Sequence, residues 1–328
     1  MKAPARLGLY ALVLAAVFAV AFVTAGAVVP EAAVQNWIEE STDGHTAGEE
    51  TDAVGHDEQA EASSLGLGLA QDGYRLSGLS APGGAQTVGE LSLTVTGPAG
   101  MPVTDFDVDH EKELHLIVVR ADGEYFRHVH PKLNADGAWS LPWEWEAAGT
   151  YRVFADFVPS DTGKGITLST SMQVAGNYTP VTPEEQVTAI TVDGFEVSLN
   201  GDLTVGEFSE LNLIVTSDGE PVTSLEPYLG AFGHLVALRQ GDLAYLHVHP
   251  VGEEPRAGET SGPEIAFDAS APTPGRHLLF LDFKVDGQVH TAALVVDAVG
   301  GSGAQQDSDE DSQNNGEDSN INEEEGGS

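Results

Sequence analysis

The chain has 328 residues, of which 52 are acidic and 13 are Lys or Arg, so its formal net charge is −39. It contains no cysteine, which excludes disulfides, thiolate-ligated metal sites and thiol catalysis. Nucleic-acid binding needs clustered basic residues to neutralise phosphates, so we expect no nucleic-acid partner. The length predicts about two domains.

Residues 1–30 are predicted to form a transmembrane anchor or a signal segment. The stretch from Leu7 to Val29 has 23 uncharged residues, enough for a helix of about 34 Å that crosses a bilayer. Lys2 and Arg6 precede it and acidic residues follow it. By the positive-inside rule we expect a single-pass protein with a cytoplasmic N-terminus and its domains outside the cell membrane. Secretion after signal cleavage is the alternative.

Two acidic segments flank the middle of the chain. Residues 31–70 are rich in Ala, Gly and acidic residues without hydrophobic periodicity, which indicates a linker. Residues 300–328 are a low-complexity run of Ser, Asp, Glu and Asn, which predicts a disordered tail. The middle is also acidic, as is typical of a solvated, self-repelling surface.

An internal repeat organises the middle of the chain. Segments 71–176 and 193–299 share an ordered series of motifs and are separated by a linker at 177–192. Their short alternating runs are rich in Val, Thr and aromatic residues and are punctuated by Gly, Pro and Asp, which predicts strands. We therefore expect an all-β fold, with two tandem immunoglobulin-like or cupredoxin-like β-sandwich domains.

Histidines recur at a fixed spacing in the first repeat. The dipeptide Asp122-Gly123 between two alternating runs predicts a hairpin in which the numbers of paired residues sum to 245. This register places His115 opposite His130, with His128 diagonally beside them on the same sheet face. Three imidazoles are therefore expected to converge.

The second repeat carries the same spacing. Its loop is Gly241-Asp242, so the numbers of paired residues sum to 483. His234 is then expected opposite His249, with His247 beside them.

Three imidazoles in this arrangement can coordinate one ion at about 2.0–2.1 Å. Imidazole suits Zn(II) and Cu(II), whereas Cu(I) usually recruits Cys or Met, and neither Met101 nor Met172 falls in the pattern. We predict one three-His site per repeat that binds Cu(II) or Zn(II). Only neutral imidazole binds metal, so binding is expected to fade as the pH falls through about 6. The alternative is that the histidines pack without metal.

Asp156 and Asp282 are further candidate site residues. They occupy equivalent places in the strands Phe-Ala-Asp-Phe and Phe-Leu-Asp-Phe. An Asp buried in an apolar strand is costly unless it is paired, so each is expected either to ligate the metal or to hold a ligand His by its second nitrogen. His110, His277 and His290 have no His counterpart in the other repeat and are interpreted as structural or surface residues.

Residues 72–299 resemble an uncharacterised family of bacterial membrane-anchored extracytoplasmic proteins with two β-sandwich repeats. The resemblance rests on the segments 111–119 and 228–236, on Phe154 to Phe157, and on the two His-Val-His-Pro motifs. Such proteins are similar to heavy-metal and copper-handling components. The resemblance implies a metal-binding role by analogy, with a metal-transport protein as partner.

The residues favour a binding protein over an enzyme. Serine triads, phosphate loops and nucleotide fingerprints are not apparent in the sequence. We expect a non-enzymatic protein that chelates or hands over metal. A structural or interaction module with packed histidines is the alternative. A zinc-dependent hydrolase or lyase is less favoured, because no general base other than the Asp lies at a fixed spacing from the histidines in both repeats.

Overall fold

The computed structural model describes residues 65–300 except 182, 247 and 257. The predicted anchor or signal segment, residues 31–64 of the acidic linker and residues 301–328 of the tail lie outside these residues. Among the described residues, no helix has the length and apolar character that crossing a membrane requires.

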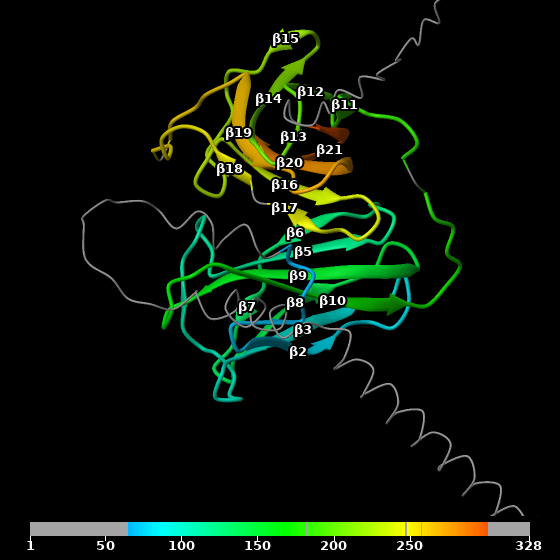
Figure 1. Ribbon diagram of the computed structural model, residues 1–328, viewed down its shortest axis with the longest axis vertical. Coiled ribbons are helices and arrows are strands. Elements are labelled where there is room, and N and C mark those ends of the chain that lie inside the picture. The colour runs from blue at the N-terminus through cyan, green and yellow to red at the C-terminus, as the bar shows by residue number, and fades with distance from the viewer. Residues whose placement is uncertain (1–64, 182, 247, 257, 301–328) are drawn as a thin grey trace, which may run out of the picture. The chain divides into compact units, whose positions relative to one another are not determined.

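The prediction of an all-β chain with two tandem β-sandwich domains is confirmed (Figure 1). Each sandwich consists of two sheets. In the first sandwich, one sheet has the order β1 (Ala70–Gln71), β2 (Tyr74–Ser80), β3 (Gly89–Thr96), β8 (Ala138–Trp143) and β7 (Lys132–Leu133). The other has the order β10 (Ile166–Val174), β9 (Gly149–Pro159), β5 (Leu114–Arg120) and β6 (Arg127–Val129), and β4 (Phe106–Asp107) also pairs with β9.

The second sandwich repeats this plan. One sheet has the order β11 (Ala189–Val192), β12 (Phe195–Asn200), β14 (Phe208–Ser217), β19 (Glu264–Ser270) and β18 (Val248–Pro250), and β15 (Glu220–Pro221) also pairs with β14. The other has the order β13 (Thr204–Val205), β21 (Gln288–Gly300), β20 (Gly275–Val285), β16 (Gly233–Arg239) and β17 (Tyr245–Leu246).

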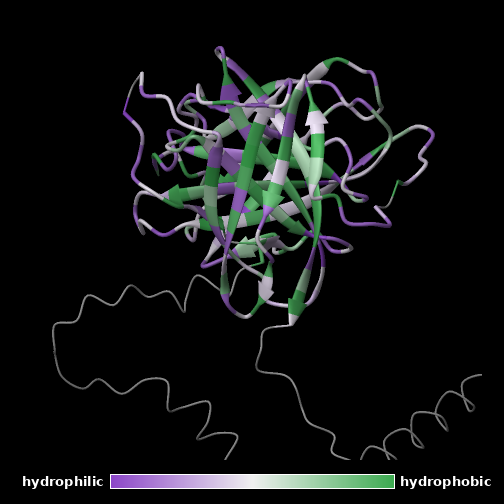
Figure 2. Ribbon diagram, turned by 90° about the horizontal axis from the view of Figure 1, so that it is seen from above, coloured by the Kyte–Doolittle hydropathy of each residue, from purple (hydrophilic) through white to green (hydrophobic). Residues whose placement is uncertain are grey.

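Each sandwich has its own hydrophobic core, built from the inward residues of its strands. On β5 these are Leu114, Leu116 and Val118, and on β16 they include Leu235 and Ala237. Figure 2 shows hydrophobic and hydrophilic residues along the strands of the described part of the chain. Burying a Leu- or Val-sized side chain contributes about 1.5–3 kcal/mol, so these faces fix which side of each strand points inward.

A third hydrophobic cluster joins the two sandwiches. It is formed by the faces of these strands that point away from their own cores: β5 and β9 in the first sandwich, and β16, β20 and β21 in the second. Strands β5 and β16 of the two sandwiches are neighbours in Figure 1. Phe126 and Phe280 stack across it with ring centroids 4.0 Å apart. Its buried members are Ile117, Val119, Phe154, Val236, Leu238, Leu243, Leu278, Phe280 and Val295. Strand β5 is therefore buried on both faces.

The predicted hairpin registers are confirmed in both repeats. In the first repeat, Ile117 pairs with His128 and Leu116 with Val129, so the numbers sum to 245. In the second, Ala237 pairs with Leu246, so the numbers sum to 483. The loop of the first hairpin is longer than the predicted two residues, since β5 ends at residue 120 and β6 begins at residue 127.

Candidate metal centre

His115 lies on the face of β5 that packs against the second sandwich. It alternates with the core residues Leu114 and Leu116 and shares its face with Ile117 and Val119 of the inter-sandwich cluster. Only 4% of His115 is exposed. The period of the strand thus carries an imidazole into an interface that is otherwise apolar.

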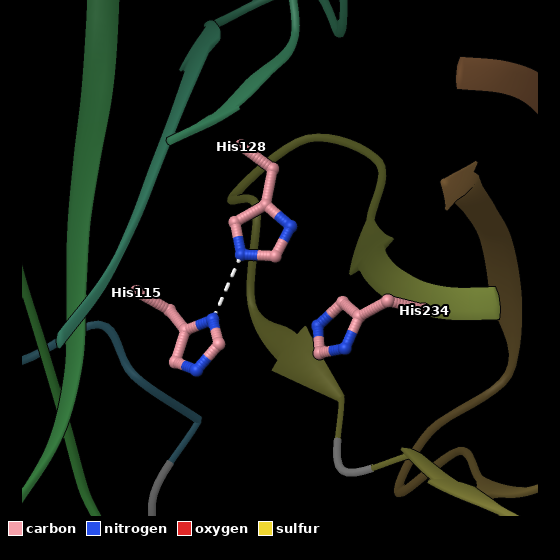
Figure 3. A group of neighbouring side chains, drawn as sticks. All are labelled: His115, His128 and His234. Atoms are coloured by element: carbon pink, nitrogen blue, oxygen red, sulfur yellow. Dashed lines mark hydrogen bonds between the residues drawn. The ribbon is translucent and has the colours of Figure 1, made fainter. Parts of the chain in front are cut away.

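Three histidines of the first repeat meet at this position. The His115 Nδ1 lies 3.0 Å from the His128 Nε2, and the His130 Nε2 lies 3.2 Å from the same His115 Nδ1. Figure 3 shows the first of these contacts as a dashed line. These spacings are close to the edge of a coordination tetrahedron, which is about 3.3 Å when each nitrogen lies 2.0–2.1 Å from the metal.

His234 of the second repeat completes the cluster (Figure 3). It lies on β16, and one ligand atom from each of His115, His128 and His234 lies within 4.8 Å of the other two. The His234 ring stacks on that of His115 with an interplanar angle of 2°. This arrangement differs from the expectation of one site per repeat, because the structure draws histidines of both repeats into one cluster between the sandwiches.

The predicted second site is not assembled from the described residues. The chain leaves the β16 sheet after β17, and β18 pairs with β19 of the other sheet, where His249 lies opposite Asp268. The side chain of His249 is therefore exposed on the other sheet, while His234 faces the first repeat. In the first repeat the equivalent crossing comes later, at β7, so His130 stays beside His115. The prediction for His247 lies outside the described residues.

Asp156 and Asp282 share the face of the histidines. Asp156 pairs directly with His115, and Asp282 pairs directly with His234, so each Asp lies beside a His on its own sheet. The two carboxylates differ in their partners. Asp156 accepts a hydrogen bond from the Thr167 hydroxyl at 2.8 Å.

Asp282 joins the two repeats. Its Oδ1 accepts from the Thr291 hydroxyl at 2.5 Å, and its Oδ2 lies 3.0 Å from the His128 Nδ1. The His128 and Asp282 side chains are 1% and 4% exposed. Asp282 thus takes the second of the two predicted roles, since it holds the candidate ligand His128 by Nδ1, the ring nitrogen that does not contact His115.

The hydrogen bonds assign a proton to one nitrogen of each ring. The backbone oxygen of Asp109 can only accept, so the His115 Nε2, 3.1 Å away, donates to it. The His128 Nδ1 likewise donates to the Asp282 carboxylate. In neutral rings, the His115 Nδ1 and the His128 Nε2 then both present lone pairs at 3.0 Å. Two lone pairs at this distance repel, so the arrangement requires a cation between them, either a proton or a metal ion.

Burial favours the neutral form of His115, His130 and His234. Burial first, and the neighbouring His128 second, lowers the pKa of His115 from 6.5 to about 4 and that of His130 to about 3. The pKa of His234 is also lowered well below 6.5, mainly by burial. Neutral imidazole is the form that binds metal, so these rings are ready to coordinate an ion at neutral pH.

These pKa values predict how the stability of the metal-free protein depends on pH. The unfolded chain binds protons on His115 and His130 near pH 6.5, whereas the folded chain does so only near 4 and 3. Each buried neutral ring therefore adds to the free energy of unfolding above pH 6.5. This contribution is expected to be lost as the pH drops toward 4, and for His115 alone it amounts to about 3 kcal/mol. Asp156 opposes this fall, because burial raises its pKa to about 6.

Urea denaturation in the presence of a chelator, at pH about 7.5, 6 and 5, measures this slope, and His115→Gln should flatten it. A stability that does not change over this range would contradict the proposed burial of neutral rings. For the same reason, protons are expected to displace metal nearer to pH 4 than to the pH of about 6 expected for unperturbed imidazole.

His110 lies beside the cluster, although no repeat motif places it there. Its ring centroid lies 6.2 Å from that of His115 and 5.8 Å from that of His234. It has no histidine counterpart in the second repeat, so the duplicated motif does not mark it as a site residue. The other two unmatched histidines lie in the second sandwich, where His277 contacts the Gly275 carbonyl and His290 contacts Asp193.

Comparison with known proteins identifies the repeated domain. Residues 70–177 and 190–300 each match the family described as "Domain of unknown function (DUF8832)". The two matched segments are the two tandem β-sandwich domains, as predicted. No curated protein sequence matches the chain.

Three solved structures illustrate the similarity. A Salmonella alpha-2-macroglobulin is 15% identical over 71% of this chain and 15% of its own, with a TM-score of 0.23. Invasin, a bacterial integrin-binding protein, is 14% identical over 70% of this chain and 39% of its own, with a TM-score of 0.21. The fibronectin(III)-like modules of Clostridium thermocellum CbhA are 12% identical over 69% of this chain and 94% of their own, with a TM-score of 0.18.

Proposed function

The chain belongs to the DUF8832 family, and we propose that it binds one divalent transition-metal ion, Cu(II) or Zn(II), between its two sandwich domains. The ligands are His115, His128 and His130 of the first repeat and His234 of the second. The protein acts by chelating the ion or handing it over, without catalysing a reaction.

One observation carries the proposal. The His115 Nδ1 and the His128 Nε2 lie 3.0 Å apart, and the other nitrogen of each ring already donates to an acceptor, the Asp109 carbonyl or the Asp282 carboxylate. A metal ion relieves the repulsion between the two lone pairs and uses the hydrogen bonds behind them, because a ligand His that donates its second N–H to a carboxylate or carbonyl is fixed in tautomer and orientation.

The ligand set favours Cu(II) or Zn(II) over Cu(I). Imidazole nitrogen suits both divalent ions, whereas Cu(I) sites usually recruit sulfur. The chain has no cysteine. Met101 is 67% exposed, and Met172 packs against the core of the first sandwich, away from the face that carries His115.

We place this function outside the cell membrane. The single-pass anchor proposed for residues 1–30 would leave the N-terminus in the cytoplasm and both sandwiches outside, and cleavage would instead release them. A metal-transport protein is the partner that such a chelator would serve.

A structural module is the second candidate function, and the apolar contact between the sandwiches favours it. In that case the cluster holds a proton where a metal would bind, and the histidines serve only to pack the interface. A zinc hydrolase or lyase is less favoured, because the two candidate ligands at the centre of the cluster, His115 and the His128 side chain, are only 4% and 1% exposed.

Counting bound metal separates these functions. We expect the purified protein, dialysed against Zn(II) or Cu(II), to retain about one ion per chain, whereas two would indicate one site per repeat. A specifically bound ion stabilises the folded state by about 2.7 kcal/mol at a free concentration of 100 times Kd, so Tm should rise with metal and fall with chelator. A stoichiometry near zero, with a Tm that does not respond to chelator, would leave the structural module as the function.

A further inference from the structure

A tight turn places His110 beside the cluster. The turn spans residues 109–112, where the Asp109 and Lys112 backbones exchange hydrogen bonds of 2.8 and 3.0 Å. Its central residues, His110 and Glu111, have φ values of 44° and 66°. This left-handed conformation is uncommon outside Gly, Asn, Asp and His, so the turn holds His110 in a defined place.

Asp109 connects His110 to the buried cluster. Its backbone oxygen accepts from the His115 Nε2 at 3.1 Å, and its carboxylate lies 3.2 Å from the His110 Nδ1. The His110 side chain is 38% exposed, whereas His115 is 4% exposed. His110 therefore lies between solvent and the buried histidines, in ring contact with His115 and His234.

Acidic side chains surround His110. On the side of His110, the Asp109 carboxylate first and Glu254 more weakly raise the pKa of His110, and both attract cations. A Cβ atom on Gly230 would lie 3.9 Å from both the Glu254 Oε1 and the His110 Cδ2, so these two side chains flank the same position.

The second repeat offers no equivalent of His110. Its matching turn spans residues 228–231, with the same pair of backbone hydrogen bonds between Tyr228 and Ala231. The residue in the place of His110 is Leu229, which is 1% exposed. Of the two matching turns in the described repeats, only the one at residues 109–112 therefore carries an imidazole beside the cluster.

We propose that His110 is an access ligand, which binds a divalent transition-metal ion from solvent or from a donor protein and passes it to His115 and His234. This inference rests on the proposed function of the cluster. A ligand of this kind changes the rates of metal uptake and release by the same factor, because it lowers the barrier between solvent and site without contributing to the final coordination.

The test measures Zn(II) uptake and chelator-driven release by stopped flow in the full protein and in His110→Asn. Asn tolerates the left-handed backbone of the turn, so the variant removes the imidazole without straining the chain. Both rates are expected to fall about tenfold, while Kd changes less than about threefold. Glu254→Gln removes a nearby charge without touching a ring, and should slow uptake and weaken its dependence on ionic strength.

Each outcome decides one point. Unchanged rates in His110→Asn, in a protein whose wild type binds metal, would overturn the access role and leave the proposed function standing. A 10–100-fold loss of affinity would overturn it as well, since His110 would then be a permanent part of the bound site. A wild-type protein that binds no Zn(II) would overturn both.

Discussion

Replacing His128 with Ala is expected to lower the affinity for Zn(II) or Cu(II) by about 100-fold or more. This histidine offers its Nε2 to the cluster, 3.0 Å from the His115 Nδ1, and its Nδ1 is held by Asp282 of the other repeat. Losing only an orienting partner of a ligand typically costs 10–100-fold in affinity, so losing the ligand should cost at least the upper part of this range. Competition against a chromophoric chelator measures the change.

The matched control is His290→Ala. His290 is also buried, at 7% exposure, and also contacts a carboxylate, that of Asp193, but it lies on β21 outside the cluster. It should lose stability without losing metal affinity. The metal affinity of Asp282→Asn should lie between those of His128→Ala and His290→Ala, with a loss of about 10–100-fold. The amide has one oxygen and cannot accept from both His128 and Thr291 as the two carboxylate oxygens do. Equal affinities in all three variants would exclude the cluster as the metal site.

Replacing Phe280 with Ala is expected to destabilise the protein by about 3–5 kcal/mol, because this buried ring loses its contacts and leaves a cavity. The ring is 4% exposed and stacks on Phe126 of the other sandwich at 4.0 Å. It lies two residues from Asp282 on the same face of β20. We therefore also expect a loss of about tenfold in metal affinity, since part of the binding free energy would be spent on bringing the two sandwiches together.

Leu281→Ala is the matched control for this effect. Leu281 is the next residue on β20, is fully buried and faces the core of the second sandwich. Its loss should cost a comparable 2–5 kcal/mol. Because this core is not shared with the first repeat, the folded variant should keep its metal affinity. If Phe280→Ala and Leu281→Ala weakened metal binding equally, the effect would follow global stability, and the contact between the sandwiches would not control the site.

The cluster is costly in the absence of a cation. His115, His128 and Asp282 lie in an interface whose other buried members are mainly aliphatic or aromatic. Polar groups in such surroundings lose hydration and must recover it through hydrogen bonds or a bound ion. Burial lowers the pKa values of His115 and His130, which favours the neutral form of these two rings at neutral pH, the form that binds a metal ion.

The sequence determined the strands, the repeat and the hairpin registers, because these depend on local periodicity and on the turns between neighbouring strands. It therefore also determined that His115, His128 and His130 share one face, and the contact between the His115 and His130 rings agrees with that register.

Only the tertiary structure decided what that face meets. Strand β5 is apolar and buried on both sides, so its pattern could not tell the side that faces its own core from the side that faces the second sandwich. Packing between the sandwiches turned two expected sites into one shared cluster, with His234 and Asp282 supplied by the other repeat. The same packing brought in His110, which no repeat pattern marks, because a contact across an interface is set by the shapes of whole sheets and not by spacing along the chain.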